Sequence, residues 1–254
     1  MVSADGGYSN GTHTGAVWVY EMNGQTTLFE KTQILLPTEA EAYGYFGWPL
    51  ALEGDVAVIA ANEDDDAAPN AGAAYVYRRN NGTGRWEMEQ KLTASDAAED
   101  DLFGERLTLC EQGIIVSAFR KQAADAYDEV GAAYFFQYEN GEWVEAQQIV
   151  TIEKSAVWYD YIWYPYEQDV KRYTLKHFGW SMKARGDTLL ITGERGSGSP
   201  NFVTSRDRPV VYQFNWDPDT NQWLEQRVLC ATDTDSGTGL GIVYNFGVPL
   251  AITE

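Results

Sequence analysis

Runs in which apolar or aromatic residues alternate with polar ones recur along most of this chain, and short polar or glycine-containing turns separate them. Clear examples lie at 46–61, 72–79 and 131–139. Alternation with a period of two predicts half-buried β-strands, and turns such as Glu53-Gly54-Asp55 and Asn140-Gly141 have the residues that tight hairpins need. The pattern therefore predicts an all-β protein of many short antiparallel strands.

The strands fall into repeats. Four segments start with Phe-Gly and continue as a strand, a short turn and a second strand, at Phe46, Phe103, Phe178 and Phe246. A glycine or an equivalent residue then leads into an aromatic-rich third strand, at Gly15, Gly72, Gly131 and Arg208. A fourth strand follows a polar turn, at 27–36, 85–94, 142–151 and 222–231. Four antiparallel strands per repeat are typical of a propeller blade.

The Phe-Gly starts resemble the FG-GAP repeats of the integrin α-chain head, and the resemblance covers nearly the whole chain. The Gly-Ala-Pro half of the family signature is degraded here to the residues at 3–5, 60–62, 117–119 and 192–194. The resemblance implies an all-β fold, a β-propeller of four-stranded antiparallel blades in four repeats. It also implies an extracellular or cell-surface location, although this chain shows no signal peptide.

We expect a single β-propeller domain over 1–254, with an aromatic insertion at 153–176. The blades are expected at 46–95, at 103–151, at 178–231, and at 246–254 completed by 1–37. Pairing of the N- and C-terminal strands would close a ring of four blades and remove exposed sheet edges. Two alternatives stay open, because propellers of this family usually have seven blades: a fragment of a larger ring, or self-association with a second copy if the ring is incomplete.

Composition limits the partners. The chain has 38 Asp and Glu against 18 Lys and Arg, a formal charge of −20, which would repel nucleic acid and anionic membrane surfaces. No run approaches the roughly 18 apolar residues of a membrane span, so membrane insertion is not expected. Two cysteines, Cys110 and Cys230, are too few for a disulfide framework, and both are expected to be buried free thiols.

The connections predict two unequal faces. In a four-stranded blade, the turns from strand one to two and from three to four share one face, and here they are minimal hairpins. The longer loops share the other face, together with the insertion, and long loops on a rigid scaffold often carry function. The insertion could offer aromatic rings to a protein or glycan partner, or the rings could pack on the blades beneath them. The candidate rings are Trp158, Tyr159, Tyr161, Trp163, Tyr164 and Tyr166.

Acidic loops on the same face could bind Ca²⁺, which prefers hard oxygen ligands, or could be solvated acidic loops. The candidate ligands are Asn62, Asp64, Asp66, Asp233 and Asp235. Integrin-type Ca²⁺ loops lie in the turn from strand one to two, and here that turn is too short to carry one. Arg185-Gly186-Asp187 occupies this turn and aligns with Glu53-Gly54-Asp55, so its glycine is explained by the hairpin. Asn10 and Asn81 head glycosylation sequons.

No catalytic pattern stands out. The only histidines, His13 and His177, belong to no arrangement with a nucleophile and an orienting acid, and we expect no enzyme activity. The glycine-rich run from Gly193 lacks the ending of a phosphate loop and is predicted to be a flexible connection. The leading hypothesis is a non-catalytic recognition or adhesion module that binds a protein or glycan through the long-loop face. The alternatives are a structural segment of a larger cell-surface propeller and a propeller-scaffolded polysaccharide hydrolase or lyase.

Overall fold

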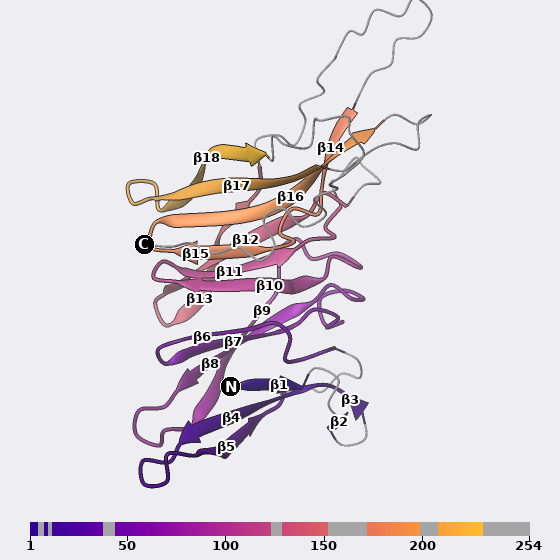
Figure 1. Cartoon of the computed structure of the whole chain (residues 1–254). Coiled ribbons are helices and arrows are strands. Elements are labelled where there is room, and N and C mark those ends of the chain that lie inside the picture. The colour runs from indigo at the N-terminus through magenta and orange to yellow at the C-terminus, as the bar shows by residue number, and fades with distance from the viewer. Residues whose placement is uncertain are drawn as a thin grey trace, which may run out of the picture.

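The computed structural model describes residues 1–4, 8–9, 12–37, 44–122, 129–151, 172–198 and 208–230. Within these ranges every regular element is a β-strand, and all the strand ladders are antiparallel (Figure 1). The strands form four main sheets and one small hairpin. The prediction of an all-β fold is confirmed.

The four main sheets are the blades, numbered here in chain order. Blade I contains β1 (Val2–Ala4), β4 (Ala16–Met22) and β5 (Phe29–Leu35), and the small hairpin of β2 (Tyr8–Ser9) and β3 (Thr12–His13) lies between β1 and β4 in the chain. Blade II contains β6 (Leu50–Glu53), β7 (Val56–Ala61), β8 (Ala73–Arg79) and β9 (Trp86–Leu92). Blade III contains β10 (Phe103–Cys110), β11 (Gly113–Ala118), β12 (Ala132–Glu139) and β13 (Glu142–Ile149). Blade IV contains β15 (Met182–Arg185), β16 (Thr188–Gly198), β17 (Arg208–Asp217) and β18 (Gln222–Cys230), with β14 (Arg172–Lys176) added beside β16.

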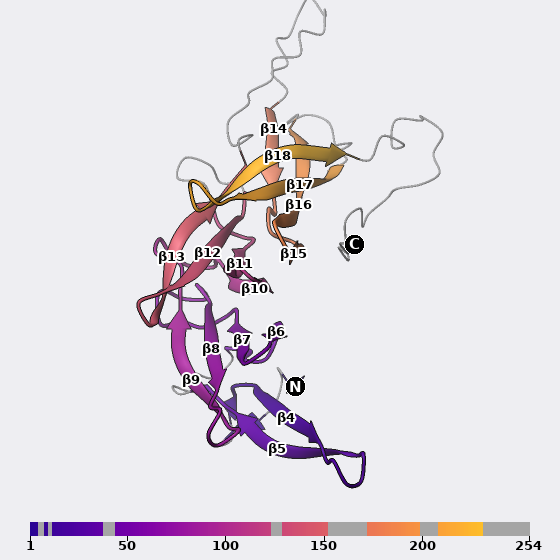
Figure 2. The ribbon, with the colours of Figure 1, turned by 90° about the vertical axis from the view of Figure 1, so that its left-hand side faces the viewer.

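The blades follow one another along an arc, as in a β-propeller, with blades I and IV at opposite ends (Figures 1 and 2). The first strands β6, β10 and β15 lie on the concave side of the arc, and the fourth strands β9 and β13 lie on its outer side. The chain is thus a β-propeller of four repeats. The C-terminal segment at 246–254, which was expected to complete blade I, lies outside the described residues.

One prediction about blade IV is wrong. The glycine-rich run from Gly193 was expected to be a flexible connection, but β16 continues through it to Gly198. Strand β14 pairs with this run on one side, and β17 pairs with its beginning on the other, from Gly193 to Arg195. Because neighbouring strands satisfy its backbone hydrogen bonds, the run holds a strand conformation despite its glycines. Strand β14 itself falls within the predicted insertion at 153–176.

Each joint between blades encloses an apolar cluster, and the Phe-Gly phenylalanine lies in each of these clusters. Each of the three described phenylalanines is at most 1% exposed. Each packs edge-on against two aromatic rings of the third strand of its own blade, in the geometry that aromatic pairs prefer. The contacts are Phe46 with Tyr75 and Tyr77, Phe103 with Tyr134 and Phe136, and Phe178 with Tyr212 and Phe214.

The glycine before each third strand allows the next blade to approach closely. Gly15, Gly72 and Gly131 have φ of +79°, +86° and +76°, a conformation that only glycine adopts without strain. A Cβ on any of them would lie 1.9–2.2 Å from the backbone oxygen of the phenylalanine that starts the next blade. Backbone of one blade therefore lies directly against backbone of the next, and the sequence requires glycine at all three positions.

A glutamine clasp completes each joint. A glutamine of one fourth strand hydrogen-bonds both backbone groups of the tryptophan at the first or second position of the fourth strand of the following blade. Gln33 Nε2 donates to the carbonyl of Trp86 at 2.7 Å, and the N–H of Trp86 donates to Gln33 Oε1 at 2.9 Å. The same two bonds join Gln90 to Trp143 and Gln147 to Trp223, at 2.7–2.9 Å. Each joint therefore combines apolar burial with two hydrogen bonds of fixed register.

Candidate functional site

The two faces of the arc differ as the sequence predicts. The hairpin face carries the turns β6–β7, β10–β11 and β15–β16 together with the turns between third and fourth strands (Figure 1). The loop face carries the longer connections, including 62–72 and 93–102. Arg185 pairs with Thr188 across the β15–β16 turn, so Arg185-Gly186-Asp187 is a hairpin on the opposite side from the loops, as predicted.

Two exposed tryptophans mark the loop face at equivalent positions of two repeats. Trp48 and Trp180 each lie two residues after the Phe-Gly phenylalanine, and they are 56% and 41% exposed. Glu105 holds the same position in blade III, between the two tryptophan-bearing blades. Exposed aromatic rings on a rigid scaffold offer contact area at low conformational cost.

Trp180 is held in place although it is exposed. Its ring packs edge-on against Phe119, with ring centroids 5.2 Å apart, and the guanidinium carbon of Arg106 lies 5.9 Å from its centroid. Arg106 in turn donates to Glu105 Oε1 at 2.7 Å, and Asn62 Nδ2 donates to Glu105 Oε2 at 2.6 Å. This network connects the loop of blade II to the tryptophan of blade IV. A partner would meet a preorganised surface, which lowers the entropy cost of binding.

The acidic residues of the loop after β7 converge on a lysine. Asp64 is only 3% exposed, and its carboxylate accepts hydrogen bonds from Lys91 Nζ at 2.8 Å and from the Tyr75 hydroxyl at 2.7 Å. Asp66 also accepts a bond from Lys91 Nζ. Burial by itself would lower the pKa of Lys91, but the bonds to Asp64, Asp66 and Tyr75 raise it overall. Lys91 is therefore a fixed cation that neutralises these carboxylates.

This arrangement bears on the predicted Ca²⁺ ligands. Asp64 and Asp66 face the ammonium group of Lys91, whereas the Asn62 side chain points to Glu105. Among the residues that the structure describes, no group of three or more Asp, Glu, His and Cys side chains is placed to hold a metal ion. Asp233 and Asp235 lie outside the described residues, and Ca²⁺ binding stays a prediction.

A second tyrosine–aspartate–lysine group joins blades II and III. The Tyr134 hydroxyl donates to Asp96 Oδ1 at 2.6 Å, and Lys121 Nζ donates to Asp101 Oδ2 at 2.8 Å and contacts Asp96 at 3.2 Å. Burial would raise the pKa of Asp96, but hydrogen bonds from Tyr134 and Lys121 lower it overall. Both groups use lysines to balance buried negative charge beneath the loop face.

His177 lies between two carboxylates beside Trp180. Its Nδ1 is 3.3 Å from Glu194 Oε2, and its Nε2 is 3.3 Å from Glu129 Oε2. The hydrogen bond to Glu194 raises the pKa of His177, against a smaller opposite effect of burial, and Glu129 raises it further. The surrounding rings of Phe119 and Trp180 are uncharged, and the guanidinium groups of Arg120 and Arg106 lie over those rings.

We expect this histidine to make stability pH-dependent. Because its pKa is raised on folding, its contribution is complete below the unfolded value of about 6.5 and is lost as pH rises through the folded value. Thermal unfolding at pH 5.5 and 8.5 should therefore show a larger decrease for the native chain than for His177→Asn, which tolerates the positive φ of 52° at this position. The difference should stay below about 1 kcal/mol, since the carboxylates are partly solvated. Equal pH responses would mean that His177 gains no partner on folding.

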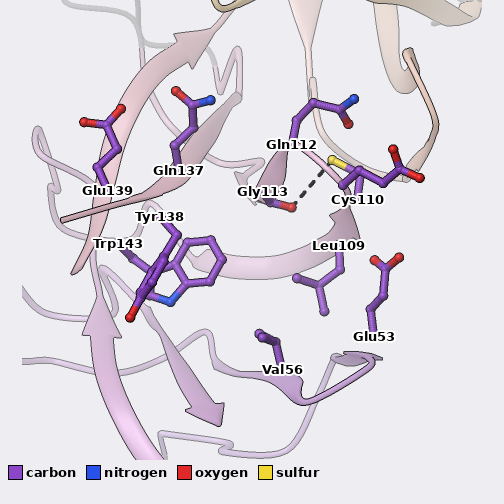
Figure 3. Close-up of a pocket in the computed structure, with 11 residues that line it drawn as sticks. Glu53, Val56, Leu109, Cys110, Gln112, Gly113, Gln137, Tyr138, Glu139 and Trp143 are labelled. Carbon is purple, nitrogen blue, oxygen red and sulfur yellow. Dashed lines mark hydrogen bonds between the residues drawn. The ribbon is translucent and has the colours of Figure 1, made fainter. Parts of the chain in front are cut away.

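The hairpin face has a hollow of its own, between blades II and III (Figure 3). It encloses about 340 Å³ and is lined by side chains that include Glu53, Cys110, Tyr138 and Trp143. Cys110 is a free, half-buried thiol whose Sγ lies 3.5 Å from the Gly113 carbonyl oxygen. Burial raises the pKa of this thiol, so it stays protonated and weakly nucleophilic at neutral pH. The side chain of Cys230 lies outside the described residues.

A match to a known repeat family covers the joints between blades I and II and between blades II and III. Residues 29–77 and 86–136 match the family model of the FG-GAP repeat. The chain carries FG-GAP repeats. Each matched stretch starts at the first residue of a fourth strand, Phe29 or Trp86, and ends at a third-strand aromatic residue of the next blade, Tyr77 or Phe136. One matched FG-GAP repeat therefore contains the fourth strand of one blade and the first three strands of the following blade.

FG-GAP repeats are typical of extracellular propeller modules of the integrin-like type. No curated protein matches the sequence. In the part of the chain that is described, no helix has the length and apolar character needed to cross a membrane.

The predicted binding residues stand as follows. All six aromatic candidates of the insertion, from Trp158 to Tyr166, lie outside the described residues, as does Asn10. Asn81 is exposed in the turn between β8 and β9, on the hairpin face. Sequence reasoning missed Trp48 and Trp180. The available signal was the tripeptide Phe-Gly-Trp, which occurs at two of the four repeat starts.

Proposed function

We propose that this FG-GAP propeller is a non-catalytic recognition module that binds a protein or glycan through its loop face. The observation that carries the proposal is the pair of exposed, repeat-equivalent rings Trp48 and Trp180. Flat aromatic surfaces with adjacent hydrogen-bonding groups suit a sugar ring or a partner side chain, and tryptophan and arginine are enriched at binding hot spots. The Glu105–Arg106 pair offers polar groups beside the Trp180 ring.

The charge of the chain narrows the choice of partner. At −20, the chain repels strongly anionic ligands, so a neutral glycan or a basic protein surface fits better than a sulfated polysaccharide. The ion pairs of Lys91 and Lys121 lie beneath the loops and support the surface without offering free cations to an acidic ligand.

Binding can be tested with three versions of the chain. The native chain is applied to an array of neutral and acidic oligosaccharides and used in parallel to capture proteins from extracellular fluid. A Trp48→Ala/Trp180→Ala variant should lose at least roughly tenfold in affinity for whatever the native chain binds, because it removes two aromatic rings of the kind that dominate binding energy. Tyr138→Ala, which removes a 46% exposed ring from the hairpin face, is the matched control. If the control loses binding and the double variant keeps it, the loop face is not the site.

A further inference from the structure

Every joint inside the chain brings together two different blade faces. We call the face that carries the clasp glutamine the outgoing face; the aromatic face that receives it is the incoming face. At the first joint, the outgoing face of blade I presents Val19 and Gln33, which are register partners. The incoming face of blade II presents Tyr75, Tyr77 and Trp86, which share one cluster with Val19. In blades II to IV the three incoming aromatics are buried, and none is more than 8% exposed.

Blade I has an incoming face with nothing against it among the described residues. By register, Trp18, Tyr20 and Phe29 hold the positions that Tyr75, Tyr77 and Trp86 hold in blade II. Phe29 is nevertheless 71% exposed, and Tyr20 and Met22 are also exposed. Val2 and Ile34, the register partners of Trp18, extend the apolar surface and are about half exposed. This face therefore has the apolar and aromatic residues of an incoming face, but no outgoing face of a described blade packs on it.

Blade IV has the complementary outgoing face. Gln213 and Arg227 are register partners there, where the other three blades place an apolar residue opposite the clasp glutamine. Leu229, which pairs with Val211 on the same face, is 37% exposed. Arg227 is exposed, and its Nε donates to Gln213 Oε1 at 2.7 Å. Among the four fourth strands, the clasp positions hold tryptophan and glutamine except at two places, where Phe29 replaces the tryptophan and Arg227 replaces the glutamine. These two residues would meet if the two faces formed a joint.

The two faces do not meet within one chain, because blades I and IV lie at opposite ends of the arc in both views (Figures 1 and 2). We propose that they meet between two copies. The outgoing face of blade IV in each copy packs on the incoming face of blade I in the other. The two identical joints are related by a two-fold axis, and the two arcs of four blades close one ring.

The chemistry of the two odd residues fits such a joint. A guanidinium group stacks on an aromatic ring, so Arg227 can lie over Phe29 and donate to its backbone carbonyl. It cannot accept from the backbone N–H of Phe29 as a glutamine would, because it has no acceptor atom. The joint between copies is therefore apolar like the internal joints but lacks the full clasp, and we expect it to be reversible.

Sedimentation equilibrium over a range of micromolar concentrations tests the proposal on the full chain. We expect a monomer–dimer equilibrium for the native chain. Phe29→Lys should leave only monomer, since it puts a charge into the apolar joint, while retaining the native circular dichroism. Leu52→Lys is the control, because Leu52 is 49% exposed on blade II, away from both end faces. It should dimerise like the native chain.

A second variant separates this joint from any other association. Phe29→Trp/Arg227→Gln installs the residues of the internal clasp and should tighten the dimer by roughly tenfold or more in dissociation constant, as expected for one added hydrogen bond at each of the two joints. Arg227→Gln alone should give most of this gain, because the clasp bonds only backbone atoms of its partner, whereas Phe29→Trp alone should give little. A native chain that stays monomeric at the highest concentration overturns the proposal. So does association that Phe29→Lys leaves intact, or growth into open chains larger than a dimer.

Discussion

Replacing Gly72 with alanine is expected to destabilise the chain by about 4 kcal/mol or more, a large part of the stability of a typical domain. The added Cβ would lie 2.1 Å from the backbone oxygen of Phe103 and 2.8 Å from that of Asn62. Neither atom belongs to a side chain that can rotate away, so blades II and III would have to separate. Urea unfolding followed by tryptophan fluorescence measures the loss.

Gly84→Ala is the control for this prediction. Gly84 has a similar φ of +71°, but the nearest atom to its added Cβ is the Arg79 guanidinium at 3.9 Å. Gly84→Ala should lower the free energy of unfolding only by the cost of backbone strain, about 1–2 kcal/mol. The difference between the two variants then measures the close approach of the blades. Equal losses would mean that the joint can relax and that the glycine serves only the turn.

Lys91→Met is expected to cost about 3–5 kcal/mol, because it leaves the buried carboxylate of Asp64 without its cation. Methionine keeps most of the lysine stem, so packing is little changed. The Tyr75 hydroxyl and the backbone N–H of Asp66 remain as donors to Asp64, but two neutral hydrogen bonds do not replace the ammonium group. Equilibrium denaturation of the native and variant chains at pH 7 gives the difference.

Two further variants show whether charge is the cause. Adding Asp64→Asn to Lys91→Met removes the unpaired charge and should recover part of the loss, since the asparagine carbonyl can still accept from Tyr75. Lys183→Met changes an exposed lysine of β15 and should alter stability by less than about 0.5 kcal/mol. If Lys91→Met costs no more than Lys183→Met, Asp64 reaches water or another cation.

Much of the fold follows from local sequence chemistry. Alternating residues, and turns such as Glu53-Gly54-Asp55, predicted the strands of blades II and III and the face to which each hairpin belongs. The extension of β16 could not be predicted this way. A run such as Gly196-Ser197-Gly198 has little strand preference, and it forms a strand because β14, more than 20 residues earlier in the chain, pairs with it.

The candidate site was harder to predict, because its contacts join residues far apart in the sequence. Asp64 and Asp66 suggested a solvated or metal-binding loop, and nothing near them indicated that Lys91, on the fourth strand of the same blade, would neutralise them. Trp48 and Trp180 lie just before the first strands β6 and β15, where alternation does not tell a buried ring from an exposed one. Gln90 likewise looked like an ordinary polar residue of a half-exposed strand.

The glutamine clasp allows the number of blades in such a protein to change. Trp86 and Gln90, four residues apart on one strand, are the receiving and the giving halves of two successive joints, and Trp143 and Gln147 repeat the arrangement. Since a clasp binds backbone atoms of its neighbour, it makes no demand on the identity of that neighbour's side chain. A duplicated or deleted blade would thus find compatible neighbours at once, so gene rearrangement could lengthen or shorten the array without new compensating substitutions at its interior.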